Sequence, residues 1–566
     1  MSRRALPFDQ AVLAPGRPYA ERAEEDTRWP DAIARALHAG TVAPLLRAVA
    51  AFTPERERLV AAVAVREETL RLLSDEVLRQ RAHALRARLR RHGFTLDAAA
   101  ESFALVRAAA QRTLGQRHFD TQLIGGWALL RGRLMEMATG EGKTFCATLP
   151  ACAVAMAGYP VHVITVNDYL AQRDAEKMEP LYAYFGFGVG VVSQGMDRAA
   201  RRAAYAKPVT YVTNKELAFD YLRDGVALQG RSSRLHQALA EEGRDDGPVL
   251  RGLYFAIVDE ADSVFVDEAR TPLILSASSG DEAAAAEQLI ELKEGVPPTT
   301  RRDTLARLTY QRLFRRYVHL AGMTGTAAEA SAEIRSVYGL ELARIPLHRP
   351  SQRAEWGVTW CGSVAKKWEL VAAAVHRVAM LQGRPVLVGT RSVAASEQLS
   401  AVLRAFGVPH ALLHGRQDAE EGEVVAQAGQ PGRVTVVTNM AGRGTDIPLG
   451  AGVEARGGLH VILTEYHDSR RVDRQLVGRC ARRGDPGSCE AIVSLEDEIF
   501  AVCAPRTSAW LRRLSNGGLV PPPSALQALR AWCQQATERR HSATRRANVR
   551  QDRQLHRSLA FAGSSE

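Results

Sequence analysis

The sequence is poor in lysine, in paired cysteines and in long apolar runs. Only 7 of its 74 basic residues are lysine, and the other 67 are arginine. Its seven cysteines include no C-x-x-C pair, which argues against a zinc site or a disulfide framework and fits a reducing compartment. No stretch approaches the roughly 20 apolar residues that span a bilayer, and no apolar signal segment follows residues 1–7. A membrane-spanning or disulfide-stabilised secreted protein is therefore not expected.

The rest of the composition is that of a large globular protein with a basic surface. At 566 residues, 46% of them hydrophobic, the chain is too long for one core and should form three or four structural units. Its net charge of +11 suits nucleic acid, an anionic membrane face or an acidic protein surface. The alternative is that arginine simply replaces lysine throughout. Arginines cluster on a predicted helix at 79–91, where a solvated face is the simpler interpretation, and at 530–557, where a contact surface is favoured.

Hydrophobic periodicity divides the chain into two α/β blocks between helical ends. Residues 1–55 are weakly patterned and are predicted to be a partly disordered extension, whereas 59–114 show helical spacing. Short β-branched runs alternating with helices follow, which predicts parallel sheets covered on both faces. The predicted strands are 161–166, 209–213, 253–258, 386–390, 434–438, 459–464 and 491–495. With a connector at 277–303 and a helix at 305–320, the predicted domains are 56–345, 346–500 and a helical, arginine-rich tail at 501–566.

Residues 135–144, MEMATGEGKT, have the pattern of a phosphate-binding loop. A strand end, a glycine turn and the start of a helix direct backbone N–H groups at a triphosphate. In such loops the lysine, here Lys143, reaches the outer phosphates, and the hydroxyl, here of Thr144, binds Mg²⁺. Met137 stands where the general pattern has its first glycine, so the match alone could arise by chance. The loop nevertheless keeps a lysine in an arginine-rich protein, which indicates a chemical requirement for a compact charge.

An acidic pair follows the predicted strand 253–258. Asp259, at the carboxyl end of a buried strand, is placed to reach the metal held by Thr144, and Glu260 to orient or polarise the attacking water. An acidic turn after a strand is the structural alternative. The paired interpretation is favoured because the phosphate loop requires a carboxylate partner further along the same sheet.

The second block contributes glycines and arginines. A glycine-rich turn at 438–446 again follows a predicted strand. On one continuous helix Arg471, Gln475, Arg479 and Arg482 would share a face, at spacings of four, four and three. Such a stripe is usually solvated, but across a cleft from a triphosphate it would supply arginine fingers. Together the two blocks indicate a motor that closes on ATP and opens after hydrolysis.

Several longer segments resemble one family, the SecA preprotein-translocase ATPases. They are QRHFDTQLIGG at 116–126, VNDYLAQRD at 166–174, DEARTPL at 267–273, AGMTGTA at 321–327, TNMAGRGTD at 438–446 and GGLH at 457–460. The resemblance extends over about residues 73–497, and DEAD-type helicases share the motor without these flanking segments. It implies an α/β fold of two RecA-like, P-loop NTPase motor domains with a helical N-terminal preface and a short helical tail.

The resemblance also implies roles for individual residues. The matching positions are Gln122 for adenine; Gly140, Glu141, Gly142, Lys143 and Thr144 for the phosphates; Asp259 and Glu260 for metal and water; residues 324–326 for coupling the two blocks; and Arg443, Asp446, Arg479 and Arg482 for second-block nucleotide contacts. The implied cofactors are ATP and Mg²⁺, with the metal at Thr144 and Asp259.

The chain departs from the family pattern in three places. The family's domain-sized preprotein-crosslinking insertion is replaced by the short connector 277–303, and only the beginning of its C-terminal helical scaffold could fit in 507–566. In the last arginine motif, Ala481 replaces a glycine and Arg483 a glutamine. On a helix the methyl group would be tolerable, whereas the extra charge could alter coupling.

The leading hypothesis is a Mg²⁺-dependent ATPase motor of protein export, cytoplasmic and peripheral on the bacterial inner membrane. The resemblance implies preprotein and a SecYEG-type channel as partners, and the basic charge adds an anionic membrane surface. One alternative is a nucleic-acid-dependent ATPase or helicase of the same motor class, although no RNA-reading module is evident. Another is a nucleotide-driven accessory switch that moves nothing.

Overall fold

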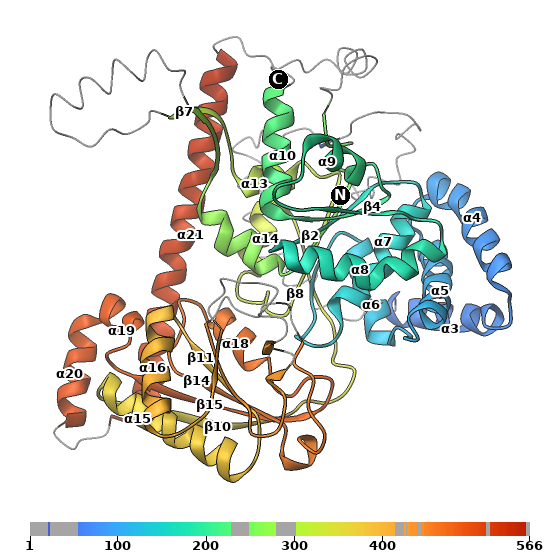
Figure 1. The fold of residues 1–566 in the computed structure, drawn as a ribbon. Coiled ribbons are helices and arrows are strands. Elements are labelled where there is room, and N and C mark those ends of the chain that lie inside the picture. Colours follow the sequence, from blue (N-terminus) through green and yellow to red (C-terminus); the bar gives the residue numbers. More distant parts are fainter. Residues whose placement is uncertain are drawn as a thin grey trace.

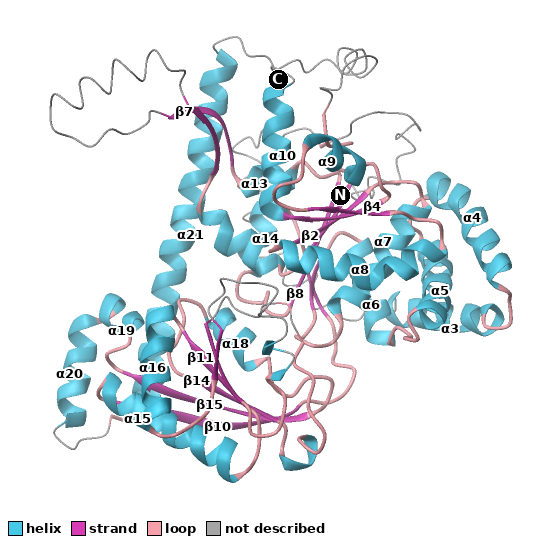
Figure 2. Cartoon of the chain, in the orientation of Figure 1, coloured by secondary structure: helices cyan, strands magenta, loops and turns pink. Residues whose placement is uncertain are grey.

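In the computed structural model the chain forms two parallel sheets, each covered by helices, with further helices beside the first sheet and one long helix along both halves (Figure 1, Figure 2). The structure describes residues 21–22, 55–227, 248–278, 302–413, 424–425, 427–438, 444, 446–516 and 521–561. Nearly all of the predicted extension 1–55 and residues 279–301 of the predicted connector lie outside these ranges. The two α/β blocks correspond to the predicted fold class.

The first sheet has seven parallel strands in the order β3-β4-β2-β5-β8-β1-β9. Its central strands β2, β4 and β5 are buried along their whole length, as expected for continuous apolar runs covered on both faces. The strands are β1 (Leu134–Glu136), β2 (Val161–Thr165), β3 (Val189–Val192), β4 (Val209–Thr213), β5 (Phe255–Val258), β8 (His319–Thr324) and β9 (Leu342–Arg344). The helices are α6 (Asp120–Leu130), α7 (Lys143–Met156), α8 (Asp168–Tyr184), α9 (Arg198–Tyr205), α10 (Asn214–Ala227), α13 (Tyr310–Arg315) and α14 (Ser331–Tyr338).

Three helices precede this sheet and confirm the helical preface predicted at 59–114: α3 (Glu55–Leu70), α4 (Asp75–His92) and α5 (Leu96–Thr113). The alanine-rich α5 is buried along most of its length because it packs against α3 on one side and α7 on the other. Small side chains allow this close approach of helices, and α7 is the helix that the phosphate loop leads into. The helical preface therefore packs against the helix that follows the phosphate loop.

The second sheet has six parallel strands in the order β10-β15-β14-β11-β13-β12. The strands are β10 (Gln352–Cys361), β11 (Val386–Thr390), β12 (Ala411–Leu413), β13 (Val434–Thr438), β14 (Leu459–Leu463) and β15 (Pro486–Ser494), and the helices are α15 (Val364–Val375), α16 (Val393–Ala405) and α18 (Arg470–Val477). All seven strands predicted from the sequence are present in the two sheets, with ends that differ by a few residues.

The helix predicted at 305–320 is wrong. The segment contains β7 (Arg302–Leu308), the short α13 and the start of β8. Strand β7 pairs antiparallel with β6 (Leu273–Ser278), and this pairing places Ser278 opposite Arg302. Periodicity cannot detect such a ribbon because its stability comes from a partner strand distant in sequence. The predicted connector 277–303 thus begins and ends within a two-stranded ribbon.

The tail is helical, as predicted, and consists of α19 (Glu498–Cys503), α20 (Pro505–Asn516) and α21 (Pro523–Phe561). At 39 residues, α21 is about 58 Å long and runs beside both halves of the molecule (Figure 1). Arg530 in its first half contacts Asp473 of α18, and Arg545 in its second half contacts Glu333 of α14. These tail arginines therefore make contacts within the chain. No helix in the described ranges is long and apolar enough to span a bilayer.

Candidate nucleotide site

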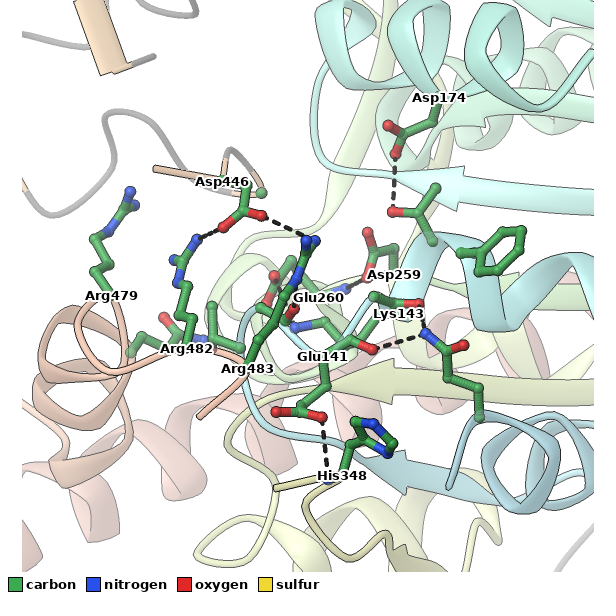
Figure 3. A pocket seen from close by; sticks show the side chains of 18 of the residues that line it. Glu141, Lys143, Asp174, Asp259, Glu260, His348, Asp446, Arg479, Arg482 and Arg483 are labelled. Carbon is green, nitrogen blue, oxygen red and sulfur yellow. Dashed lines mark hydrogen bonds and ion pairs between the residues drawn. The ribbon is translucent and has the colours of Figure 1, made fainter. Parts of the chain in front are cut away.

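A cavity of about 960 Å³ lies between the two α/β blocks (Figure 3). Residues from both blocks line it, and they include eleven of the twelve predicted site residues: Gln122, Gly140, Glu141, Gly142, Lys143, Thr144, Asp259, Glu260, Asp446, Arg479 and Arg482. The twelfth, Arg443, lies outside the described residues. The fold thus brings together groups more than 300 positions apart in the sequence.

The phosphate loop has the predicted strand–turn–helix geometry. Strand β1 ends at Glu136 and α7 begins at Lys143, so the helix N-terminus faces the cavity. Gly140 and Gly142 have φ angles of +92° and +81°, a region that glycine adopts at no steric cost. A Cβ on Gly140 would lie 2.6 Å from Cδ of Arg482, and one on Gly142 would lie 2.6 Å from Nε2 of Gln122. Both glycines are needed for backbone conformation and for close approach.

Gln122 connects the loop to the start of α6. Its Oε1 accepts a hydrogen bond from the backbone N–H of Phe119 at 2.9 Å, and its Nε2 donates to the carbonyl oxygen of Glu141 at 2.9 Å. The side chain is buried. One amide group therefore links the edge of the cavity at Phe119 to the phosphate loop.

The acidic pair lies opposite the lysine. Glu260 Oε1 is 3.7 Å from Nζ of Lys143, and the backbone N–H of Glu260 donates to Asp259 Oδ1 at 2.8 Å. Burial, followed by the nearby charge of Glu260, raises the pKa of Asp259 to about 7. Thr144 Oγ1 lies 3.5 Å from Oδ2 of Asp174 on α8, and burial also raises the pKa of that carboxyl.

These groups fit a magnesium ion bound together with phosphate. Hydroxyl and carboxylate oxygens are its preferred ligands, and two buried carboxylates that share one ammonium gain from an added positive charge. The described residues contain no cluster of three or more acidic, histidine or cysteine side chains that could hold a metal by itself. A magnesium site that takes only one or two protein ligands, with the rest from phosphate and water, does not require one.

The predicted single helical face of Arg471, Gln475, Arg479 and Arg482 is wrong. Helix α18 ends at Val477, and Gly478 caps it, so Arg479 and Arg482 lie in the turn that follows. We refer to residues 478–485 as the arginine turn. Figure 3 shows Arg479, Arg482 and Arg483 on the second-block side of the cavity.

Arg471 does not line the cavity and instead joins the two blocks. Its guanidinium forms ion pairs with Asp262 at 3.0 Å and Asp267 at 2.6 Å, and all but a few per cent of the side chain is buried. Gln475 donates to Asp262 at 2.7 Å and to Thr326 Oγ1 at 3.1 Å. Asp262 also accepts from the hydroxyls of both threonines in 324–326. The segment expected to couple the blocks thus lies at their contact.

The arginine turn reaches the phosphate loop directly. Asp446 binds Arg482 at 2.6 Å and Arg483 at 3.1 Å, and Arg483 Nε donates to the carbonyl oxygen of Gly140 at 3.0 Å. Although burial opposes it, these ion pairs lower the pKa of Asp446. Asp446 is therefore an anion that holds two arginines beside the loop that is shaped for phosphates.

The expectation that Ala481 sits on a helix is also wrong. Ala481 and Arg483 have φ angles of +54° and +55°, in the left-handed region that favours glycine. The glycine expected at position 481 from the family pattern is thus explained by backbone conformation. In this chain alanine adopts that conformation at an energetic cost.

The lining residues that were not given a role from the sequence include three that make contacts within the site. Asp174 contacts Thr144, and Phe119 and His348 stack on each other with ring centroids 3.8 Å apart and planes inclined by 18°. Asp174 and Phe119 belong to segments that carry the family resemblance, so a signal for them existed. His348 lies between the two sheets in a segment without a motif, and only the fold reveals it.

Two RecA-like α/β blocks with a phosphate loop, an acidic pair and an arginine turn around one cavity define a P-loop NTPase motor. Residues 49–335 match the family model described as the SecA DEAD-like domain, and 353–456 and 449–515 match the SecA P-loop domain. The chain belongs to the SecA family. The DEAD-like and P-loop assignments support nucleotide binding and ATPase activity.

Curated relatives cover nearly all of the chain. It is 42% identical to "Protein translocase subunit SecA 2" of Nitrosospira multiformis, with 88% of this chain and 91% of that protein aligned. It is 39% identical to the protein of the same name from Bordetella avium, with 98% of this chain and 99% of that protein aligned. That alignment has 669 positions against 566 residues here, so at least 103 of its positions are gaps in this chain. Among solved structures, yeast Dbp5 bound to RNA and ADP BeF3 aligns with 77% of this chain and 97% of its own, at 13% identity and a TM-score of 0.44.

Proposed function

We propose that this SecA-family protein is a Mg²⁺-dependent ATPase motor that couples ATP hydrolysis at the cavity between its blocks to protein translocation. The observation that carries the proposal is the convergence of the phosphate loop, the acidic pair and the arginine turn on one cavity. Family membership favours protein translocation over the alternative of a nucleic-acid-dependent ATPase.

The proposed role of each residue rests on the family resemblance and is supported by its position at the cavity. Gln122 reads the adenine, and the backbone N–H groups of the loop with Lys143 hold the phosphates. When bound, the magnesium ion neutralises phosphate charge, and Thr144 and Asp259 would hold it. Glu260, buried beside Lys143, orients the attacking water and accepts its proton.

The second block acts from across the cavity. Arg479 and Arg482 stabilise the negative charge that develops on the transferred phosphate. Asp446 orients Arg482, and Arg443 is proposed as a further nucleotide contact on the basis of the family resemblance. Because these groups belong to a different block from the phosphate loop, hydrolysis and release change the forces between the blocks.

The partners and location are also proposals. Preprotein and a SecYEG-type channel are the proposed partners, and the proposed location is the cytoplasmic side of the inner membrane, where the net charge of +11 favours an anionic surface. A chain that lacks internal segments present in its relatives must grip its substrate with fewer parts, or with the help of a partner.

Lys143→Ala tests the site. The variant is expected to lose ATP hydrolysis while still unfolding in one cooperative transition, because Lys143 is the group that reaches the outer phosphates. Lys215→Ala is the matched control, since Lys215 is exposed on α10 and does not line the cavity. Chelation of Mg²⁺ should abolish hydrolysis by the unchanged protein. Full turnover by the Lys143 variant would refute the assignment.

The coupled activity is tested by stimulation. ATPase activity should rise with unfolded preprotein plus inner-membrane vesicles and should not rise with RNA or DNA. Stimulation by nucleic acid alone would reject the translocation proposal and leave the ATP site intact. An unstimulated ATPase would instead support the accessory switch.

A further inference from the structure

The segment 345–351 joins β9 of the first sheet to β10 of the second and touches the nucleotide cavity beside Phe119 and Gln122. We refer to this segment as the interblock linker. We call this part of the cavity the base end, because Gln122 is the residue proposed to read the adenine. The ring of His348 stacks on Phe119. The backbone N–H of His348 donates to Oε2 of Glu141 in the phosphate loop at 3.3 Å (Figure 3). Both His348 and Phe119 line the cavity, and both are exposed to it or to solvent.

The same stretch of chain contacts the arginine turn. A Cβ built on Gly484 would lie 2.8 Å from Cβ of Arg349, so the residue after His348 packs directly on the turn. Gln352, the first residue of β10, donates from Nε2 to the carbonyl oxygen of Gly484 at 2.6 Å. The linker therefore connects the base end of the cavity to the groups that face the phosphates.

The position of the aromatic pair relative to the base follows from Gln122. Phe119 precedes Gln122 by three residues and donates its backbone N–H to that side chain. A base that Gln122 reads must lie next to Phe119 and His348. Flat aromatic surfaces bind a purine by stacking without regard to its hydrogen-bonding edge, so the pair adds affinity while Gln122 adds selectivity.

We propose that His348 is a base-recognition residue: with Phe119 it forms an aromatic wall that stacks on the nucleobase and links base binding to the interblock linker. This inference depends on the proposed nucleotide site. It assigns to a linker residue a function that no motif in the chain indicates. It also explains how binding of the base can affect the arginine turn, because Arg349 and Gln352 contact that turn.

The test compares a ligand with a base and one without. Binding of ATP and of inorganic tripolyphosphate, each with Mg²⁺, is titrated against the unchanged protein, His348→Ala and His348→Phe. His348→Ala should weaken ATP binding about three- to tenfold, the value of one lost aromatic contact, and should leave tripolyphosphate binding unchanged. His348→Phe keeps the stack and should restore ATP affinity to within about twofold. In turnover, His348→Ala should raise KM and leave kcat at saturation unchanged.

Leu347→Ala is the matched control because Leu347 is an exposed linker residue, 43% accessible, that does not line the cavity. It should change neither affinity. Equal weakening of both ligands by His348→Ala, or the same effect from Leu347→Ala, would show a general disturbance of the linker and overturn the inference. Unchanged ATP affinity in His348→Ala would overturn it as well. Failure of the unchanged protein to bind ATP would count against the nucleotide site itself.

Discussion

Replacement of Ala481 by glycine should stabilise this protein. Ala481 has a φ angle of +54° in the arginine turn, where its Cβ crowds the neighbouring backbone. A left-handed conformation costs a non-glycine residue roughly 1–2 kcal/mol. Glycine removes that cost but gives the unfolded chain extra freedom, which costs about 0.4–1 kcal/mol. The difference predicts a net stabilisation on the order of 0.5–1 kcal/mol for Ala481→Gly.

Urea denaturation measures this difference through the midpoint, provided that the slope of the transition stays the same. Ala401→Gly is the matched control, because Ala401 is exposed within α16 and has helical backbone angles. There the same change should destabilise by about 1 kcal/mol. A higher urea midpoint for Ala481→Gly together with a lower one for Ala401→Gly would support the reasoning. A lower midpoint for Ala481→Gly, similar to that of the control, would refute the argument that the turn is strained.

The other predictions concern catalysis, the tail helix and acid stability. Glu260→Gln should keep ATP affinity while lowering kcat by about 100-fold or more, measured by phosphate release; equal loss of binding would contradict its role with water. Arg545→Ala leaves the half-buried Glu333 without its ion-pair partner and should destabilise by about 2 kcal/mol in urea, whereas a shift below about 0.5 kcal/mol would show that α21 is held elsewhere. Burial lowers the pKa of His162 to about 3 and that of His319 to about 4, so both stay neutral in the folded protein. In the unfolded chain these two histidines bind protons below about pH 6.5. The free energy of unfolding should therefore fall as the pH drops toward 4, by about 1.4 kcal/mol per pH unit for each histidine. His162→Gln should reduce that slope, and an unchanged slope would refute the assignment.

Much of the motor could be predicted because its signals are local. Long β-branched strands such as β2 and β4 are buried on both faces, and apolar continuity detects such strands reliably. The phosphate loop and the acidic pair are likewise contiguous in sequence. The three-residue strands β9 and β12 were missed because so short a run carries no periodicity, and their pairing depends on neighbours distant in the chain.

The errors at the site arise from tertiary structure. The spacing argument assumed that the helix containing Arg471 continues to Arg482, but Gly478 caps it and the chain turns to enter β15. Arg471 then pairs with acidic residues of the first block, which no sequence pattern near it shows. His348 was missed for the same reason. Its importance comes from the proximity of Phe119, more than 200 positions earlier, and not from its own neighbours.

The backbone itself marks the site in a way that is independent of motifs. Among the described residues, the non-glycine residues with positive φ are Glu260, Ala481 and Arg483. Glu260 and Arg483 line the cavity, and Ala481 lies between the predicted arginine fingers. Strained conformations persist where the surrounding structure determines them strongly, and such places are commonly functional. At the proposed nucleotide site these positions place charged groups at the cavity: Glu260 lines it directly, and the path of the arginine turn brings Arg479, Arg482 and Arg483 to it. The left-handed cost at Ala481 is therefore best understood as part of holding Arg479 and Arg482 in place, which is why a glycine there should relax the turn without removing its function.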